Sequence, residues 1–291
     1  MSGFDVRNSL FVDGGFAPGS GRLRGYAPPP DAAGRAVHFA ANSVGMYRTS
    51  ALSGVSDSSK GTISYWYRLA ETPYSTGHRL LVLNNSLNGD GLPDSTDPGT
   101  YFYAQSAAST GPFAFLWDGT ASNTTTFQGS MTQDAEWHHI AMAWDTDFAA
   151  GSRTRQMVID GGPIVITSVN DVGAAFNVDL DKPGGCSINN TGFFGTTWVG
   201  PITAIEMAEL YVNFAEHVDL SRLSNIAKLR NPVTGKPVYL GTDGALLTGT
   251  APAIYLRVDG GAEASSFATN RGTGGNFTIT GSLALAATGP Y

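Results

Sequence analysis

Residues 61–69 read GTISYWYRL and residues 137–145 read WHHIAMAWD. Both stretches alternate large apolar side chains with smaller or polar ones, which is the period-two pattern of a β-strand that buries one face. In the first stretch Ile63, Tyr65 and Tyr67 fall on the same face of the strand. The sequence therefore predicts two core strands, each of which packs a row of large side chains into a hydrophobic interior.

Similar strand signals recur at short intervals, and the composition favours them. Charged residues make up 14% of the 291 residues, whereas an average soluble protein has about 25%, and glycine (37) and proline (15) are abundant. A hairpin is predicted over residues 155–168, where Asp160, Gly161 and Gly162 form the turn. The other predicted strands lie at residues 78–85, 100–105, 112–119, 186–192, 205–213, 252–258 and 276–283.

One segment has helical spacing instead. Leu220, Leu223 and Ile226 recur at helical intervals after Asp219, which we expect to be the N-cap, and the pair Asn231-Pro232 ends the pattern. About a dozen short strands and one short helix predict an all-β protein, an antiparallel jelly-roll sandwich.

Charge and cysteine content exclude several classes of function. A net charge of −7 argues against binding to nucleic acid, which needs a basic surface. No apolar run has the length of a signal peptide or a membrane span. Cys186 is the single cysteine, so an intrachain disulfide and a C-x-x-C metal or redox site are excluded, and we expect folding in a reducing cytoplasm.

Residues 1–36 are predicted to form an extended arm. Glycines and prolines, including three consecutive prolines after Ala27, interrupt any periodic pattern there. Large apolar side chains are poorly placed on a free tail, so we expect the arm to dock on the main domain or on a partner. The predicted docking residues are Phe4, Leu10, Phe11 and Phe16.

The order of several motifs resembles a laminin-G-like module of the concanavalin A-like jelly-roll class. These motifs are VHFAANSVGMY at residue 37, GTISYWYRL, WHHIAMAWD, RQMVIDGG and GPITAIEMAELYVNFAEHVDLS at residue 200, and the resemblance covers about residues 37–230. It implies two antiparallel sheets packed face to face, with a calcium or sugar site on the rim loops in some members. Fold resemblance alone fixes no function.

Residues 231–283 resemble C-terminal extensions of such modules in structural proteins of tailed bacteriophages. This second resemblance implies a non-enzymatic virion protein: a capsid decoration protein, a head spike or fibre, or a tail component. Such a protein would be made in the host cytoplasm, bind other virion proteins, form a homo-oligomer such as a trimer, and contact a host-surface glycan. The alternative is a free carbohydrate-binding lectin module, and a glycan hydrolase or lyase comes third.

The predicted organisation is an arm (1–36), the sandwich (37–230) and a C-terminal extension (231–291) that completes the sandwich or contacts a partner.

No catalytic residues are predicted. Glucan-cleaving enzymes of this class place acidic residues at i, i+2 and i+4 on one strand, so that they share a face. Glu206 and Glu209 are three residues apart, and on a regular strand they would point to opposite faces. The adjacent His138 and His139 would also lie on opposite faces, so we expect this strand to serve core packing.

A calcium loop is one interpretation of residues 86–97, SLNGDGLPDSTD. The oxygen-bearing side chains Asn88, Asp90, Asp94 and Asp97 have the spacing of ligands 3, 5, 9 and 12 of a calcium loop, although Ser86 departs from the pattern at the first position. The other interpretation is an ordinary solvated turn, because Asp, Asn, Gly and Pro are also turn formers.

Aromatic residues next to turns are candidates for a sugar-binding platform on the rim. Trp117 precedes Asp118-Gly119, and Phe193, Phe194 and Trp198 lie in the segment TGFFGTTWVG. A sugar ring could stack on such side chains, although aromatics in these positions also close the open end of a sandwich.

Overall fold

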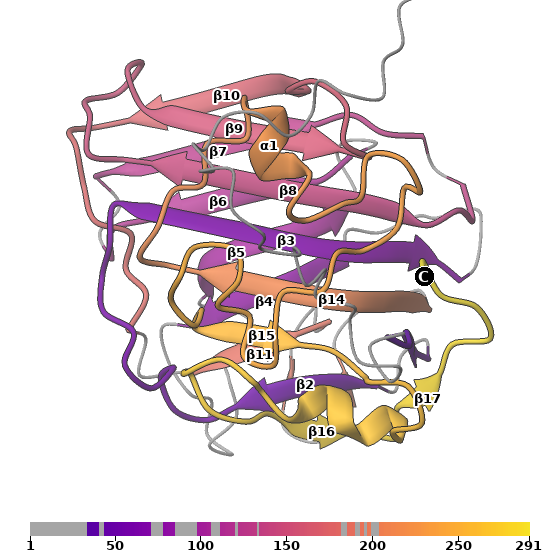
Figure 1. The fold of residues 1–291 in the computed structure, drawn as a ribbon. Helices are drawn as coiled ribbons and strands as arrows, with labels where there is room; N and C mark the ends of the chain where they lie inside the picture. Colours follow the sequence, from indigo (N-terminus) through magenta and orange to yellow (C-terminus); the bar gives the residue numbers. More distant parts are fainter. Residues whose placement is uncertain are drawn as a thin grey trace, which may run out of the picture.

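The structure, a computed structural model, describes residues 34–40, 44–70, 78–84, 98–105, 111–119, 122–132, 134–181, 185–189, 193–194, 197–198 and 204–291. Over these residues the protein is an antiparallel sandwich with one short α-helix, α1 (Leu223–Ile226), as predicted (Figure 1). The described helices are too short and too polar to cross a membrane.

The first sheet carries the two strands that the sequence placed in the core. Its order is β17 (Ala284–Leu285), β1 (Val37–Phe39), β14 (Ile205–Asn213), β3 (Lys60–Leu69), β8 (His138–Asp145) and β9 (Thr154–Ile159), and β15 (Ile254–Leu256) also pairs with β14. The strands β3 and β8 pair over eight positions, from Lys60 opposite Asp145 to Tyr67 opposite His138.

The second sheet lies behind the first in Figure 1. Its order is β10 (Ile166–Val172), β7 (Thr124–Gly129), β6 (Phe113–Trp117), β5 (Pro98–Gln105), β4 (His78–Asn84), β11 (Cys186–Ile188), β2 (Gly45–Arg48) and β16 (Thr278–Thr280). A separate pair is formed by β12 (Phe193–Phe194) and β13 (Thr197–Trp198).

The main core fills the space between the sheets. Tyr65, Tyr67 and Trp144 of the first sheet are fully buried, and the Trp144 ring lies 5.4 Å from the Phe102 ring of the second sheet. Gly61 lies against the Trp144 indole, where a Cβ would have no room. The alternation of large side chains seen in the sequence is therefore the inward face of the first sheet.

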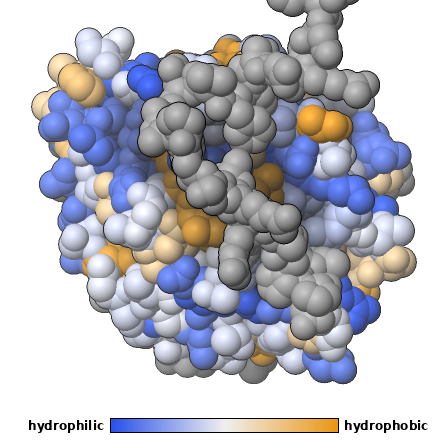
Figure 2. Space-filling view, in the orientation of Figure 1, coloured by the Kyte–Doolittle hydropathy of each residue, from blue (hydrophilic) through white to orange (hydrophobic). Residues whose placement is uncertain are grey.

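A second hydrophobic cluster covers the outer face of the first sheet. In Figure 1, α1 and the chain around it lie over β8 and β9. Ile226 and Leu229 pack there against Ala141, Ala143 and Val158. On the face shown in Figure 2, hydrophobic residues form small separate patches among hydrophilic ones.

The predicted helix is present, but its predicted cap is wrong. The N-cap position belongs to Arg222, which makes no side-chain cap bond. Asp219 lies three residues earlier, and its carboxylate accepts hydrogen bonds from Ser221 N (3.0 Å) and from Gln156 Nε2 (2.9 Å) on β9. Asp219 therefore ties the approach to the helix to the first sheet.

The predicted hairpin over residues 155–168 is only partly formed. Asp160 and Gly161 both have positive φ and make the turn after β9, and Val158 forms a single bridge with Ile164. The chain then changes sheets, because β10 pairs with β7 of the second sheet.

The C-terminal part of the chain contributes to both sheets. Strand β15 pairs with β14, β17 pairs with β1, and β16 pairs with β2. A 3₁₀ helix, Ala264–Ala268, buries Phe267 against Phe39 of β1. The arm residues Phe4, Leu10, Phe11 and Phe16 lie outside the described residues, so the docking role of the arm stays a prediction.

Candidate functional site

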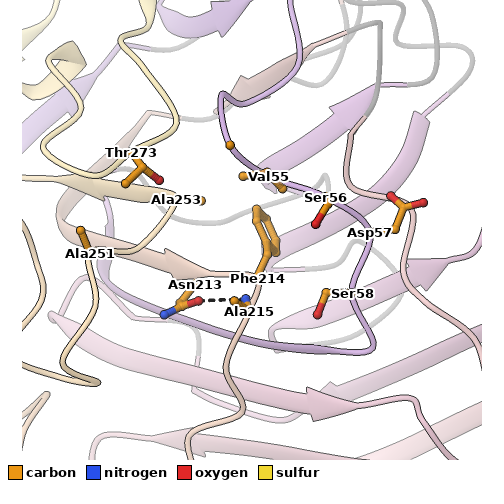
Figure 3. Close-up of a pocket in the computed structure, with 11 residues that line it drawn as sticks. Val55, Ser56, Asp57, Ser58, Asn213, Phe214, Ala215, Ala251, Ala253 and Thr273 are labelled. Carbon is orange, nitrogen blue, oxygen red and sulfur yellow. Dashed lines mark hydrogen bonds between the residues drawn. The ribbon is translucent and has the colours of Figure 1, made fainter.

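A pocket of about 250 Å³ opens where four segments meet (Figure 3). The segments are the loop that precedes β3, the end of β14, and two stretches of the C-terminal part. The lining residues are Gly54, Val55, Ser56, Asp57, Ser58, Asn213, Phe214, Ala215, Ala251, Ala253 and Thr273.

Local hydrogen bonds hold the walls of the pocket in place. At the end of β14, Asn213 Oδ1 accepts a bond from Ala215 N (2.9 Å), which turns the chain away from the sheet. On the opposite wall, Thr273 N donates to Pro252 O (2.9 Å). Gly272 permits this contact, because a Cβ at that position would collide with the Pro252 carbonyl.

The lining combines hydrogen-bonding groups with one aromatic ring. Figure 3 shows Phe214 between the wall that bears Val55 and the wall that bears Ala253. The ring is buried and packs 6.3 Å from Trp144, so the pocket has a rigid base. Asp57 Oδ1 accepts a hydrogen bond from Leu180 N (2.8 Å), which orients the carboxylate. Among the described residues that line the pocket, Asp57 is the only titratable group, so these residues supply no acid–base pair.

Asp57 also belongs to a cluster of carboxylates. One oxygen each of Asp57, Asp179 and Asp181 lie within 4.8 Å of one another. Such oxygens are the ligands that a hard cation such as Ca²⁺ prefers. The cluster is exposed to solvent on one side, so these three residues could hold a cation next to the pocket.

The sequence alone did not predict this cluster of carboxylates. Asp57 precedes β3, whereas Asp179 and Asp181 precede β11, and about 120 residues separate them in the chain. The available signal was the Asp-x-Asp spacing at residues 179–181, which is common in loops. Only the close packing of the two loops, with Ser58 and Val178 bonded to each other through their backbones, brings the carboxylates together.

The predicted calcium loop and most of the predicted sugar platform are not described. Asn88, Asp90, Asp94 and Asp97 lie outside the described residues. Of Phe193, Phe194 and Trp198, the structure describes the backbone alone, in the paired strands β12 and β13.

Of the four residues of the predicted sugar-binding platform, Trp117 is the one whose side chain the structure describes. It ends β6 and is partly buried. Its carbonyl accepts a hydrogen bond from Asp179 N (2.8 Å), so it is next to the carboxylate cluster. The structure thus connects Trp117 with a possible cation site that the sequence did not predict.

The prediction that Glu206 and Glu209 lie on opposite faces is wrong. A β-bulge interrupts β14: Glu209 and Leu210 together oppose Tyr65, and Glu209 has a φ of 50°. The bulge shifts the alternation by one residue. Both glutamates therefore lie on the outer face of the first sheet, whereas Met207 and Leu210 enter the main core.

Both glutamates are already engaged by other side chains. Glu206 Oε2 accepts a hydrogen bond from Arg68 Nε (2.6 Å). Glu209 accepts bonds from the hydroxyls of Tyr255 (3.0 Å) and Tyr291 (2.8 Å), and Arg257 Nη1 lies 3.6 Å away. Burial raises the pKa of Glu209, although Arg257 opposes this shift. These contacts give the two carboxylates structural roles.

The two adjacent histidines are separated as predicted. His139 is fully buried, and its Nε2 lies 2.9 Å from Ser64 Oγ on the outer face. His138 lies at the rim, with Nδ1 2.7 Å from Asp160 and Nε2 3.0 Å from Asp134. The buried Ser64–His139 pair has no access to solvent, so we assign it a packing role.

No family model and no curated protein matches the chain. Among solved structures, it is similar to domains LG4-5 of the mouse laminin alpha1 chain, with 17% identity, a TM-score of 0.40, and coverage of 67% of this chain and 45% of that one. It is also similar to CBM40 of the Ruminococcus gnavus IT-sialidase, with 14% identity, a TM-score of 0.41, and coverage of 65% and 95%.

A third similar structure is the binding domain of botulinum neurotoxin serotype C1. The identity is 12% and the TM-score 0.38, and the match covers 57% of this chain. The chain thus spans 35% of the neurotoxin chain and less than half of the laminin chain. At this identity the similarity concerns the fold, and the function has to be inferred from the geometry of the site.

Proposed function

We propose that this protein is a non-enzymatic binding module that takes a neutral sugar unit in the pocket between the 54–58 loop, the end of β14 and Thr273. The observation that carries the proposal is the chemistry of the lining. Hydroxyl, amide and carboxylate groups surround a small cavity that has a buried aromatic base. Ligand sites of this kind use a few placed polar groups to orient the ligand.

The lining favours a neutral polyol over an anion. Ser56 offers a hydroxyl, and Asp57 is an acceptor for a sugar hydroxyl. The hydroxyls of Ser58 and Thr273 donate to Lys60 O and Pro252 O, and each keeps a lone pair that can accept a further hydrogen bond. The described lining contains neither lysine nor arginine, so a phosphate or an acidic sugar would meet Asp57 without a compensating cation from these residues. The volume of about 250 Å³ suits one sugar ring.

A cation at the carboxylate cluster would assist this function. Asp57 lies in both the pocket and the cluster. An ion held between Asp57, Asp179 and Asp181 would offset their mutual repulsion and fix the Asp57 carboxylate at the pocket wall. We therefore expect calcium to increase affinity for the sugar and chelator to lower it.

The test is a titration of the full chain with neutral mono- and oligosaccharides from a glycan array, followed by calorimetry on the best ligand. Asp57→Asn should weaken binding about 10- to 100-fold, because it removes a charge-assisted hydrogen bond. Asp147→Asn is the matched control, since Asp147 is exposed and lies outside the pocket. The proposal fails if no neutral glycan binds, or if both variants bind as well as the wild type.

The virion role implied by the resemblance of residues 231–283 stays a prediction. In that case residues 1–36 would dock on a capsid or tail protein, and the sugar pocket would face a host-surface glycan. Mass spectrometry of purified particles with copy counting tests the role: hundreds of copies mean decoration, and a handful mean a tail or fibre component. Deletion of residues 2–30 should then abolish incorporation and leave a folded β domain.

A further inference from the structure

Exposed apolar side chains gather at one edge of the sandwich. Among the described residues, four of the seven large hydrophobic side chains that remain exposed lie on β10 or beside its ends: Phe148, Ile164, Val169 and Val172. Ile164 lies two residues before β10. The loop that carries Phe148 is bonded to the residue after β10, through Ala150 N and Gly173 O (3.2 Å).

Strand β10 is also an open edge of the second sheet. In the described part of the chain it pairs with β7 alone, so its other side presents backbone N–H and C=O groups without a neighbouring strand. Natural edge strands usually carry lysine, proline or outward charges that prevent pairing with another chain. Residues 166–172 contain neither lysine nor proline.

The one charge on this strand does not protect the edge. The Asp171 carboxylate accepts hydrogen bonds from Arg155, Thr125 and Gly151 N, and it is buried by these contacts. The remaining side chains of β10 are neutral. The register of β10 against β7 shifts at Thr167, and from Ser168 to Val172 the pairing is regular. Over this regular part the edge is uncharged and partly apolar, which are properties of a strand that pairs with another strand.

We propose that β10 pairs antiparallel with β10 of a second copy of this chain, across a two-fold axis at Val169. Val169 is the central residue of the seven-residue strand. In this register Val169 lies opposite Val169 of the second copy, and Ser168 lies opposite Asn170. The register shift at Thr167 ends the regular part of the pair, so Thr167 and Ile166 of one copy lie near Asp171 and Val172 of the other.

The register explains why the occupant is a second copy. Apolar residues lie opposite apolar residues, polar residues lie opposite polar ones, and no like charges meet, so the strand is complementary to itself. The antiparallel arrangement also brings Ile164 of one copy toward Phe148 of the other, which covers the exposed apolar groups at both ends. The two second sheets would then form one continuous sheet. This inference does not depend on sugar binding.

The first test is the mass of the full chain in solution, measured by light scattering after size exclusion at micromolar concentration. The wild type should have the mass of a dimer and Val169→Lys that of a monomer, because two lysines would meet at the axis. Val169→Lys should keep the circular dichroism spectrum of the wild type, which shows that it is folded. The control is Val233→Lys, a substitution at a residue that is 91% exposed and lies in the turn after α1, and it should stay dimeric.

The second test is the register. In an antiparallel pair, directly opposite Cβ atoms lie about 4.5–5.5 Å apart and diagonal ones about 7–8 Å apart. Val169→Cys should therefore form an intersubunit disulfide under mild oxidation, and Ser168→Cys should not. Cys186 is buried and does not compete. A monomeric wild type, a dimer or trimer that survives Val169→Lys, or equal cross-linking at both positions would overturn the proposal.

Discussion

Strands β14 and β10 have similar lengths and both mix apolar with polar residues, yet they have opposite environments. All nine residues of β14, IEMAELYVN, are buried, including two glutamates and an asparagine. In β10, ITSVNDV, five of the seven residues are exposed and the other two only partly buried. The first strand lies at the centre of a covered sheet and the second lies at an open edge.

The difference shows that a polar strand is buried when another part of the chain packs over its outer face. The outer face of β14 carries Glu206, Glu209 and Tyr211. Glu206 pairs with Arg68 of β3, whereas the C-terminal part of the chain supplies Tyr255, Arg257 and Tyr291 to pair with Glu209 or pack on Tyr211. Buried carboxylates are tolerated only with such partners. In the described part of the chain no segment packs over β10 in this way, and five of its seven residues stay exposed.

The largest effect should come from removal of Arg257, which is fully buried and pairs with Glu209 and Asp259. Arg257→Met leaves the buried carboxylate of Glu209 without its cation and should lower the free energy of unfolding by about 3–5 kcal/mol. Urea unfolding followed by tryptophan fluorescence measures the loss. Arg222→Met, at an ion pair whose arginine is 72% exposed, should cost less than about 1 kcal/mol. Equal losses in the two variants would contradict the comparison.

The same deletion of two methyl groups can be made in each strand. Val212→Ala in β14 removes a fully buried side chain and should cost about 2–3 kcal/mol, whereas Val169→Ala in β10, at 43% exposure, should change the monomer by less than about 0.5 kcal/mol. The measurement is again urea unfolding. For β10 it should be made at a protein concentration low enough that the chain is monomeric, so that association does not contribute. A costly Val169→Ala there would mean that β10 is covered within the single chain.

A smaller loss of stability should come from removal of one hydrogen bond between the C-terminal part of the chain and β14. Tyr291→Phe removes the hydroxyl that donates to Glu209 Oε1 (2.8 Å) and leaves a buried carboxylate oxygen with one fewer donor. We expect a loss of about 1–2 kcal/mol in the free energy of unfolding. The idea is wrong if Tyr291→Phe leaves the free energy of unfolding unchanged.

The smallest expected effect is the pH dependence of stability that the adjacent histidines of β8 cause. Hydrogen bonding to Asp160, against the opposing effect of burial, raises the pKa of His138 to about 8, and burial lowers the pKa of His139 to about 3. Because the folded pKa of His138 is above its unfolded value, its contribution is complete below about pH 6.5 and is lost as the pH rises through about 8.

The contribution should be about 1 kcal/mol, since Asp134 and Asp160 are partly exposed. Unfolding at pH 6 and pH 9 measures it, and His138→Asn should remove the difference. Proton titration by NMR should show one imidazole with a high pKa and one that stays neutral above pH 4. Two ordinary titrations near pH 6.5 would contradict both assignments.

Much of the fold followed from local pattern. The alternation in GTISYWYRL and WHHIAMAWD predicted the core strands β3 and β8, because a period of two places every second side chain on one face whatever the neighbours are. The abundance of turn formers and the lack of helix-favouring residues predicted the sandwich. The spacing of Leu220, Leu223 and Ile226 predicted the single helix, although its cap was misplaced by three residues.

The candidate site could not be predicted in the same way. The bulge at Glu209 depends on how β14 is matched to β3, and no local signal in IEMAELYVN shows that one residue is unpaired. The pocket and the carboxylate cluster join loops that are far apart in the chain, and Asp57 becomes a site residue only because Asp179 and Asp181 pack beside it.

The sequence by itself thus determined that residues 61–69 and 137–145 form strands and which of their faces are apolar, since both depend on the period of the pattern. Only the tertiary structure decided which strand is covered and which is an edge, and which distant loops share a pocket. The physical reason is that cover and proximity come from long-range packing, where the C-terminal part of the chain buries the polar face of β14 and leaves β10 free to pair.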